Sequence, residues 1–354
     1  MSPTLPPRDQ NVIHAPHVVI LGAGASIAAY QDWGSVGPPL PSMQDLIDVL
    51  SLRIVLETKG VDVDGLNFEA LYDDLASSGR DPELQNAIER TVAEYFRALV
   101  LPDRATIYDY LILGLRDKDL IASFNWDPFL IQAYLRNEKV APTKRPRIAF
   151  LHGNVFVGAC QKDRVSGING RRCSRCGEVF TPSKLLYPVK HKDYSTDFFI
   201  KSEWNTLRHY LGRAYYLTIF GYGAPKTDVE ARALMLDVWQ GNKSLELAEV
   251  DVIDVKPRDE IEASWEEFFY SHHYMVTDRV TNSYLFQHPR RSCDAFASAT
   301  LMCDPWHDNP FPGFEKLEEL QAWVAPLVNE EEAYDRERKP FSDQALPPNE
   351  NRAP

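Results

Sequence analysis

His17-Val-Val-Ile-Leu-Gly-Ala-Gly-Ala-Ser26 joins an apolar run to a glycine-rich turn, and this stretch decides the fold class. The run predicts a buried strand over His17–Leu21. Directly after it, the missing Cβ atoms of Gly22 and Gly24 permit a sharp turn that brings backbone N–H groups close to a phosphate. Turns of this composition also join strands to helices without any ligand. Taken alone, the stretch leaves a nucleotide site and a structural turn equally open.

Further apolar strands alternate with segments of helical periodicity along the chain. Strands are expected at 120–123, 148–151, 216–220 and 250–255. Helices are expected at about 42–54, 68–75, 82–99, 107–115, 128–135, 204–214, 228–240 and 259–269. This alternation predicts an α/β fold, a Rossmann-like doubly wound parallel sheet with helices on both faces. Polar residues at the carboxyl ends of such strands would meet in one crevice.

Changes in composition divide the chain into an N-terminal arm (1–16), a main domain (17–270), a C-terminal segment (271–328) and an acidic, Pro-rich tail (329–354) that we expect to be disordered. Within the main domain, 158–192 is Gly-rich and basic and predicts a small inserted module that contains cysteines. The aromatic residues between 274 and 311 fit either a cap over the core or an interface with a partner.

Charge and composition exclude several classes of protein. The net charge of −13 argues against strong direct nucleic-acid binding, which needs clustered Lys and Arg. No apolar run approaches the length of a membrane span, and the polar N-terminus lacks the apolar stretch of a secretory signal. Five cysteines are too few and too unevenly placed for a disulfide framework. We therefore expect a cytoplasmic protein without a membrane partner.

Three polar motifs follow predicted strands. They are Phe124-Asn-Trp-Asp127, Leu151-His-Gly-Asn154 and Gly221-Tyr-Gly223, the last with Asp228 shortly after it. Each motif alone has a structural explanation, because strand-end polar groups cap helices and Pro128 suits a first helical turn. Their combination and order, together with the opening turn, favour a shared site.

This order of motifs resembles the sirtuin superfamily over about 17–267. Gly22–Ser26 resembles the family's GAGxS turn, 124–127 its TQNxD segment, 151–154 its LHGN, 221–223 its GTS, and Cys173-Ser-Arg-Cys176 half of its zinc knuckle. The resemblance implies that 17–270 is an NAD-binding catalytic domain with a zinc-knuckle-like insert at 158–192.

Departures from the family's pattern indicate a branch. The stretch Pro-Asp-Phe-Arg is replaced by Ala28-Ala-Tyr-Gln-Asp32, and the FGE strand that binds acyl-lysine by Leu185-Leu-Tyr-Pro-Val189. Asn67-Phe-Glu69 and the run from Trp204 to Asp228 resemble the sirtuin-like NAD-hydrolase branch of bacterial anti-phage defence effectors. The resemblance implies an NAD glycohydrolase that yields nicotinamide and ADP-ribose or a cyclised product. Two alternatives stay open, an NAD-dependent protein-lysine deacylase and a nucleotide-binding assembly subunit with little turnover.

The resemblance also implies roles for individual residues. Asp127 would hold the nicotinamide carboxamide, Asn125 would position water or the ribose hydroxyls, and His152 would act as a general base, which its ordinary pKa of about 6.5 suits. Gly22, Ala23, Gly24 and Ser26 would bind the phosphates of NAD. Gly221 and Gly223 would let the adenosine half pass close to the chain, with Thr227 or Asp228 nearby. Asp254 would contact the adenine ribose.

The cysteine module predicts half of a metal site. Cys173 and Cys176 supply two ligands for a tetrahedral zinc ion, and Cys160 a third. The fourth ligand could be Asp163 or His191, and a metal-free loop stays equally open. Any zinc here would be structural, because cleavage of the nicotinamide–ribose bond needs no Lewis acid.

Unregulated NAD destruction would be toxic, so the resemblance further implies a gated enzyme. We expect control by homo-oligomerisation or by a separate partner, such as a ring-forming ATPase or another phage-sensing protein.

Overall fold

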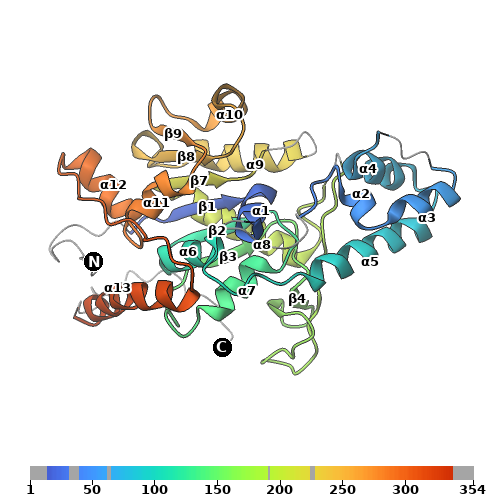
Figure 1. Ribbon diagram of the computed structural model, residues 1–354, viewed down its shortest axis with the longest axis horizontal. Coiled ribbons are helices and arrows are strands. Elements are labelled where there is room, and N and C mark those ends of the chain that lie inside the picture. Colours follow the sequence, from blue (N-terminus) through green and yellow to red (C-terminus); the bar gives the residue numbers. More distant parts are fainter. Residues whose placement is uncertain (1–13, 32–39, 62–64, 190–191, 224–227, 338–354) are drawn as a thin grey trace.

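A six-stranded parallel sheet forms the centre of the molecule (Figure 1). The computed structural model describes residues 14–31, 40–61, 65–189, 192–223 and 228–337. The strands lie in the order β3-β2-β1-β7-β8-β9, and every neighbouring pair is parallel. Their bounds are β1 His17–Leu21, β2 Leu120–Ser123, β3 Arg147–Phe150, β7 Tyr216–Phe220, β8 Glu249–Ile253 and β9 Tyr274–Thr277. The order runs outward in both directions from β1, as in doubly wound Rossmann sheets, so the predicted fold class is confirmed.

Helices cover this sheet. Every residue of β1 and of β7 is buried, which requires cover on both faces and explains why these strands are almost wholly apolar. Helix α1 packs on α6 and α6 on α7, whereas α8 packs on α9 and against β2 and β3. The helices around the sheet are α1 Ala23–Gln31, α6 Ile107–Gly114, α7 Phe129–Arg136, α8 Phe198–Leu211, α9 Val229–Gln240 and α10 Arg258–Trp265, with short 3-10 turns at Leu245–Leu247, Glu266–Phe268 and Val280–Asn282.

Four helices form a lobe at one side of the sheet, on the right in Figure 1. They are α2 Leu46–Val49, α3 Leu52–Thr58, α4 Phe68–Ser78 and α5 Pro82–Ala98. Helix α5 matches its prediction, with Asp81 accepting from the N–H of Leu84 at 3.0 Å. The single helix expected over 42–54 is interrupted, because Ser51 adopts a left-handed conformation with φ of 53°. The sequence did not show that these helices form a lobe of their own.

The cysteine-containing module is a separate three-stranded sheet in the order β5-β4-β6. Its strands are β4 Val157–Cys160, β5 Val165–Ile168 and β6 Thr181–Pro182, and both pairs are antiparallel. The predicted small insert is therefore present, with more regular structure than its sequence suggested.

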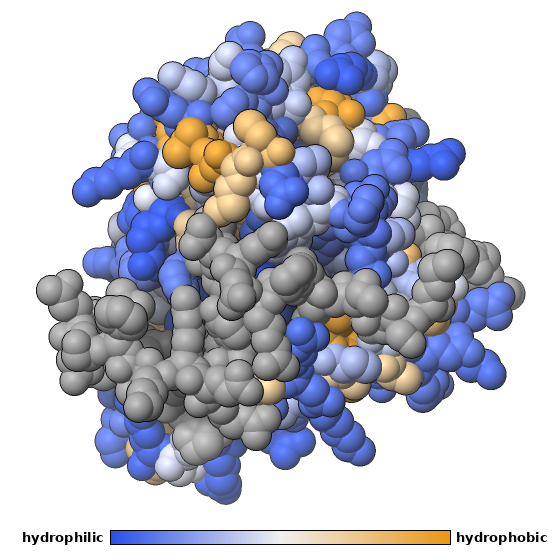
Figure 2. Space-filling view, turned by 90° about the vertical axis from the view of Figure 1, so that its left-hand side faces the viewer, coloured by the Kyte–Doolittle hydropathy of each residue, from blue (hydrophilic) through white to orange (hydrophobic). Residues whose placement is uncertain are grey.

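The C-terminal segment is more ordered than expected. Its elements are β9, α11 Tyr284–Gln287, α12 Ser292–Leu301 and α13 Leu317–Glu337. Tyr274–Thr277, for which no strand was predicted, pairs with β8 as the sixth strand. The aromatic side chains of Phe286 and Phe296 are buried against the rest of the chain. The face of the molecule on this side is mostly hydrophilic, with apolar residues in separate groups (Figure 2).

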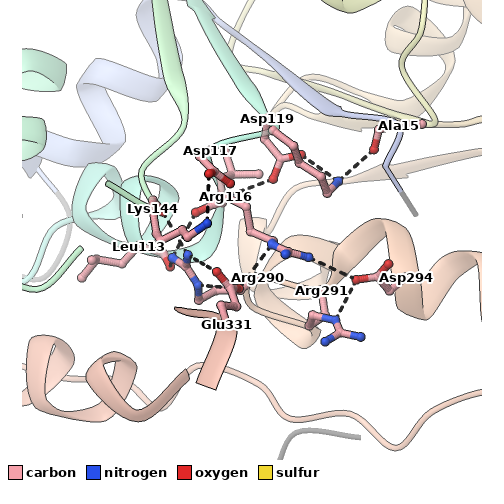
Figure 3. A network of polar contacts seen from close by, with 12 residues as sticks. Ala15, Leu113, Arg116, Asp117, Asp119, Lys144, Arg290, Arg291, Asp294 and Glu331 are labelled. Carbon is pink, nitrogen blue, oxygen red and sulfur yellow. Dashed lines mark hydrogen bonds and ion pairs between the residues drawn. The ribbon is translucent and has the colours of Figure 1, made fainter. Parts of the chain in front are cut away.

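Helix α13 also corrects the expected start of the disordered tail. The helix continues past Asn329 as far as Glu337, because its inner face is docked. Val328 is buried, and the buried Glu331 carboxylate binds Arg290 at 2.6 Å (Figure 3). Residues 1–13 of the predicted arm and 338–354 of the tail lie outside the described residues. Within the described part of the chain, no helix combines the length and the apolar character needed to cross a bilayer.

Candidate functional site

A cleft of about 360 Å³ opens at the carboxyl ends of β1, β2, β3 and β7. This volume is in the range of small-molecule sites, and the place beside β1 is where ligands bind in open α/β sheets. The strand-end segments contribute one wall, and the helical lobe contributes the other. The first wall includes Gly22, Ala23, Ser26, Asn125, Asp127, His152, Gly221, Tyr222, Gly223 and Asp228. The second includes Glu69 of α4 and Phe96 of α5, together with Met43, which precedes α2.

The glycines of the two turns pack against each other at the base of the cleft. Gly24 N–H donates to the carbonyl of Gly221 at 2.9 Å, and Gly22 N–H donates to that of Phe220 at 3.0 Å. A Cβ atom on Gly22 would lie 2.5 Å from the Gly221 oxygen, and one on Gly24 2.8 Å from the Gly221 Cα. Gly221 itself has a φ of 60°, which favours glycine. Close contact between the turns after β1 and β7 thus accounts for all three glycines, whether or not a phosphate binds beside them.

Ser26, Tyr108, Asn125 and Asp127 form a hydrogen-bonded network in the floor of the cleft. Ser26 Oγ donates to Asp127 Oδ2 at 2.6 Å and lies 2.7 Å from Tyr108 Oη. The Asn125 amide nitrogen donates to the Gly22 carbonyl and to Ser26 Oγ, each at 2.8 Å, and approaches Tyr108 Oη at 3.2 Å. The hydroxyl hydrogen of Ser26 is therefore committed to Asp127 and is not offered to a phosphate.

Asp127 is buried beneath the cleft, with Oδ1 accepting the N–H of Phe129 at 3.1 Å as α7 begins. Burial raises the pKa of this carboxyl to about 6, against the opposing effect of its hydrogen bonds from Ser26 and Phe129. The site thus contains a carboxylate that ionises close to neutral pH.

His152 lies in an enclosed, largely aromatic environment. Its Nε2 is 3.4 Å from Tyr194 Oη, and the edge of its ring meets Phe124 with centroids 4.7 Å apart. The carboxylate of Asp228 lies 4.0 Å from the same nitrogen and binds the buried Lys192 ammonium. Burial lowers the pKa of His152 to about 4, although Asp228 opposes this shift. The imidazole is therefore neutral at physiological pH and can accept a proton, as a weaker base than the ordinary pKa of about 6.5 implied.

Asn154 supports the site without lining the cleft. Its amide nitrogen donates to the Asp127 carbonyl at 2.6 Å, and its carbonyl oxygen accepts the N–H of Phe156 at 2.9 Å. Its backbone N–H and C=O both bond to Ser183 Oγ, at 3.1 and 2.8 Å. Asn154 thereby ties the Asn125–Asp127 turn to the chain that leaves the cysteine module.

Gly223, Asp228 and Lys256 also line the cleft. Asp228 accepts from Tyr222 Oη at 3.1 Å as well as from Lys192, so it faces inward. Asp254 is not among the described residues that line the cleft. Its carboxylate accepts the N–H of Lys256 at 3.1 Å, closing the turn after β8. Thr227 lies outside the described residues.

Several residues that line the cleft or lie directly behind it were missed in the sequence. Tyr108 lies in a helix in which all residues are buried, so its sequence pattern is that of a core helix. Lys192, Tyr194 and Tyr222 carry no motif of their own. Glu69 belongs to the noted Asn67-Phe-Glu69 stretch, which could have suggested a contribution from the lobe to the site.

The cysteine module brings four ligating side chains together. Sγ of Cys160, Cys173 and Cys176 and a carboxylate oxygen of Asp163 all lie within 4.8 Å of one another. Cys160 and Cys176 Sγ are 3.5 Å apart, and Asp163 Oδ2 is 3.2 Å from Cys173 Sγ. Such a compact set of three thiols and one carboxylate suits a tetrahedral zinc ion. Asp163 occupies the fourth position, while the other candidate, His191, lies outside the described residues.

Comparison with known proteins gives matches among solved structures. No protein-family model and no curated protein matches the chain. It is similar to a Sir2 homolog–NAD complex (12% identity, 91% of this chain and 92% of that one, TM-score 0.40). It is also similar to a structure described under the mechanism and regulation of Sir2 enzymes (11%, 92% and 95%, 0.39) and to Sir2 bound to acetylated peptide (11%, 75% and 87%, 0.37). At identities of 11–12% and TM-scores of 0.37–0.40, these likenesses assign no role to any side chain.

Proposed function

We propose that the protein is an NAD glycohydrolase, which breaks the bond between nicotinamide and ribose and transfers the ribosyl carbon to water. The observation that carries the proposal is the meeting of an amide, a carboxylate and a neutral imidazole around one cleft at the strand ends, in Asn125, Asp127 and His152. Those are the groups needed to hold a carboxamide, orient a nucleophile and accept its proton. Had Asn125 and His152 faced separate surfaces, the proposal would have failed.

In this mechanism the C–N bond breaks with its electron pair passing to the nicotinamide nitrogen, which leaves an oxocarbenium-like ribose. Asp127 accepts a hydrogen bond from the carboxamide of the leaving group. A water molecule, oriented by Asn125, attacks the ribosyl carbon. The neutral His152 accepts the proton that this water loses. The N-terminus of α1 faces the cleft at Ala23 and favours the pyrophosphate through the helix dipole.

The surroundings of His152 favour water over an acyl-lysine as the second substrate. The segment Leu185–Val189 is held against this histidine, with the Leu186 N–H donating to the His152 carbonyl at 3.0 Å. Tyr194 and the Lys192–Asp228 pair occupy another side of the ring. A small nucleophile fits beside a ring enclosed in this way.

The test measures nicotinamide released from NAD by wild type and by His152→Ala, without and with acylated peptide. Hydrolysis predicts release from NAD alone, and the variant should lose about 10²–10⁴-fold in kcat while staying folded. His17→Gln is the matched control, because His17 is also fully buried but lies at the opposite end of β1. Release that requires the peptide would identify a deacylase, and saturable NAD binding without release would identify an assembly subunit.

We further propose that the enzyme serves as an NAD-depleting defence effector gated by homo-oligomerisation or by a partner such as a ring-forming ATPase. The motif resemblance supports this proposal. Mass measurements taken with and without candidate partners, alongside nicotinamide release, test whether turnover appears only in an assembled state.

For the cysteine module we propose a structural zinc ion held by Cys160, Cys173, Cys176 and Asp163. None of the four is among the residues lining the cleft, so the ion would stabilise the insert and take no part in the reaction. Elemental analysis should find about one zinc per chain. Cys173→Ser should lose the metal and lower the melting temperature with little change in initial kcat. Unchanged melting behaviour and no bound metal would favour the metal-free loop.

A further inference from the structure

The hydrogen bonds in the floor of the cleft fix the orientation of the Asn125 side chain. The Gly22 carbonyl can only accept a hydrogen bond. The amide group facing it at 2.8 Å must therefore be the NH₂ of Asn125. Both hydrogens of that NH₂ are used, one on Gly22 and one shared between Ser26 Oγ and Tyr108 Oη. The Asn125 carbonyl oxygen has no partner among the described residues, and it is the group left for the cleft.

The same hydrogen bonds also fix which group is the donor in each of the remaining contacts. With Asp127 ionised, Ser26 must donate its single hydrogen to the carboxylate at 2.6 Å. Ser26 Oγ can then only accept, so the 2.7 Å contact with Tyr108 is a hydrogen bond that Tyr108 donates. Tyr108 also offers its lone pair to the Asn125 amide. Tyr108 therefore contacts both Asn125, whose amide oxygen faces the cleft, and Ser26, which donates to Asp127.

The backbone around Tyr108 is held firmly. Thr106 and Asp109 form a reciprocal capping box at the start of α6, with Asp109 Oδ2 accepting from the backbone N–H and from Oγ1 of Thr106 at 2.8 and 2.6 Å. Arg136 Nε and Asn137 Nδ2 each donate to Asp109 Oδ1 at 2.7 Å. The position of the phenol is thus determined by the first turn of α6 and its contacts with α7.

From this geometry we infer that Tyr108 is a positioning residue for the reaction, which keeps the Asn125 amide oxygen turned toward the cleft and the Ser26 hydrogen turned toward Asp127. The inference rests on the proposed function. It adds that Asn125 acts on the substrate as a hydrogen-bond acceptor, toward the attacking water or a ribose hydroxyl. It also assigns Ser26 to holding Asp127, in place of the phosphate contact that its motif implied.

Tyr108→Phe removes the hydroxyl and keeps the ring. Without it, Ser26 loses a donor and the shared Asn125 hydrogen loses an acceptor, so both side chains gain freedom to rotate. Because small misplacements of reacting groups cost as much as about 10²-fold in rate, kcat should fall by roughly 10- to 10²-fold. The KM and the Kd for NAD should change by less than about threefold, since Tyr108 is not among the residues lining the cleft.

Tyr216→Phe is the matched control. Tyr216 is also fully buried and donates to a carboxylate, Asp251, at 2.8 Å, but it lies within β7 away from the cleft. It should lose stability without losing kcat. An unchanged kcat in Tyr108→Phe, or a fall no larger than that in Tyr216→Phe, would overturn the inference. A loss confined to KM would overturn it as well.

A second measurement separates this inference from the proposed function. In ¹H–¹⁵N spectra, the side-chain amide signals that disappear in Asn125→Ala are assigned to Asn125. These signals should be protected from solvent exchange in wild type and in Tyr216→Phe, and should lose protection in Tyr108→Phe. This readout needs no turnover. Loss of protection in a protein that never releases nicotinamide would refute the hydrolase and retain the hydrogen-bonding role of Tyr108. Unaltered protection would refute that role whatever the activity.

Discussion

Two buried polar networks in the described part of the chain lie at opposite ends of β1 and β2, and they differ in charge. The floor of the cleft follows Leu21 and Ser123 and contains a single carboxylate among neutral groups. The other network, shown in Figure 3, begins just before β2 and consists mainly of ion pairs. Its charged members are Arg116, Asp117, Lys118, Asp119, Lys144, Arg290, Arg291, Asp294 and Glu331.

Arg290 illustrates how the charged groups of the second network are paired within the protein. Its guanidinium donates to both Glu331 oxygens, at 2.9 and 2.6 Å, and to the carbonyls of Leu113, Leu115 and Lys144 at 3.1, 3.2 and 2.9 Å. These bonds join the C-terminal segment to the chain around α6. In the cleft, by contrast, an Asn125 oxygen stays without a partner among the described residues. A buried network whose charges are paired within the protein is typical of a structural role, whereas an open acceptor beside a cleft is typical of a binding site.

The largest effect on kcat should come from removing the Asn125 side chain from the cleft network. Asn125→Ala removes the acceptor that faces the cleft, and kcat per folded molecule should fall by about 10²–10⁴-fold. Asn242→Ala is the matched control, because Asn242 is a buried asparagine that donates to Ala214 O at 2.7 Å, away from the cleft. It should cost stability and leave kcat unchanged. Equal kcat losses in the two variants would contradict a specific role of the Asn125 acceptor in the reaction.

Breaking an ion pair in the network of Figure 3 should lower stability and leave the reaction rate unchanged. Glu331→Gln leaves the buried guanidinium of Arg290 without its counter-charge, and removing one member of a buried ion pair typically costs about 3–5 kcal/mol. The free energy of unfolding, measured with urea, should fall accordingly, while kcat per folded molecule stays the same. The exposed pair of Arg258 and Glu262, 2.7 Å apart, provides the contrast. Arg258→Ala should cost no more than about 0.5 kcal/mol. A loss of kcat in folded Glu331→Gln would connect the two networks.

The pH dependence should assign the acid limb of activity to Asp127. With its pKa at about 6, the carboxyl protonates below that pH and becomes a donor, so kcat/KM should fall about tenfold per pH unit. His152, with a pKa of about 4, is still neutral over this range. A limb near pH 4 would assign the loss to His152.

Stability should change in the opposite direction over the same window. Because the folded pKa of Asp127 lies above its ordinary value, the folded state binds this proton more tightly than the unfolded state. Relative to Asp127→Asn, which does not ionise, wild type should therefore lose stability as the pH rises from about 4 to 6. The difference in unfolding free energy between the two proteins, measured across this range, checks the sign.

The strand-end residues of the cleft were predictable because their signal is local. A buried apolar run and the polar residues directly after it, such as Asn125 after Ser123, lie within a few positions of each other. Parallel pairing then brings the strand ends together without further information. The alternation of strands and helices predicts the sheet for the same reason.

The missed features depend on contacts between distant parts of the chain. Tyr108 bonds to Ser26 across 82 positions and to Asn125 across 17, and within its own helix it is one buried residue among others. Strand β9 has only four half-buried residues, and its pairing with β8 makes it a strand. Similarly, the order of α13 beyond Asn329 depends on Glu331 meeting Arg290, 41 positions earlier in the chain.

The smallest effect is expected at Asp254, a strand-end carboxylate that belongs to neither network. Sequence resemblance implied a contact with the adenine ribose, but this carboxylate closes its own turn by accepting the Lys256 N–H at 3.1 Å. Asp254→Ala should therefore raise the KM for NAD by less than about threefold, a change worth no more than about 0.7 kcal/mol of binding. Kinetics with NAD and NADP in parallel test this prediction. A KM raised by 10²-fold or more, or a gain in NADP turnover, would mean that the carboxylate leaves its turn to bind ribose when the dinucleotide enters.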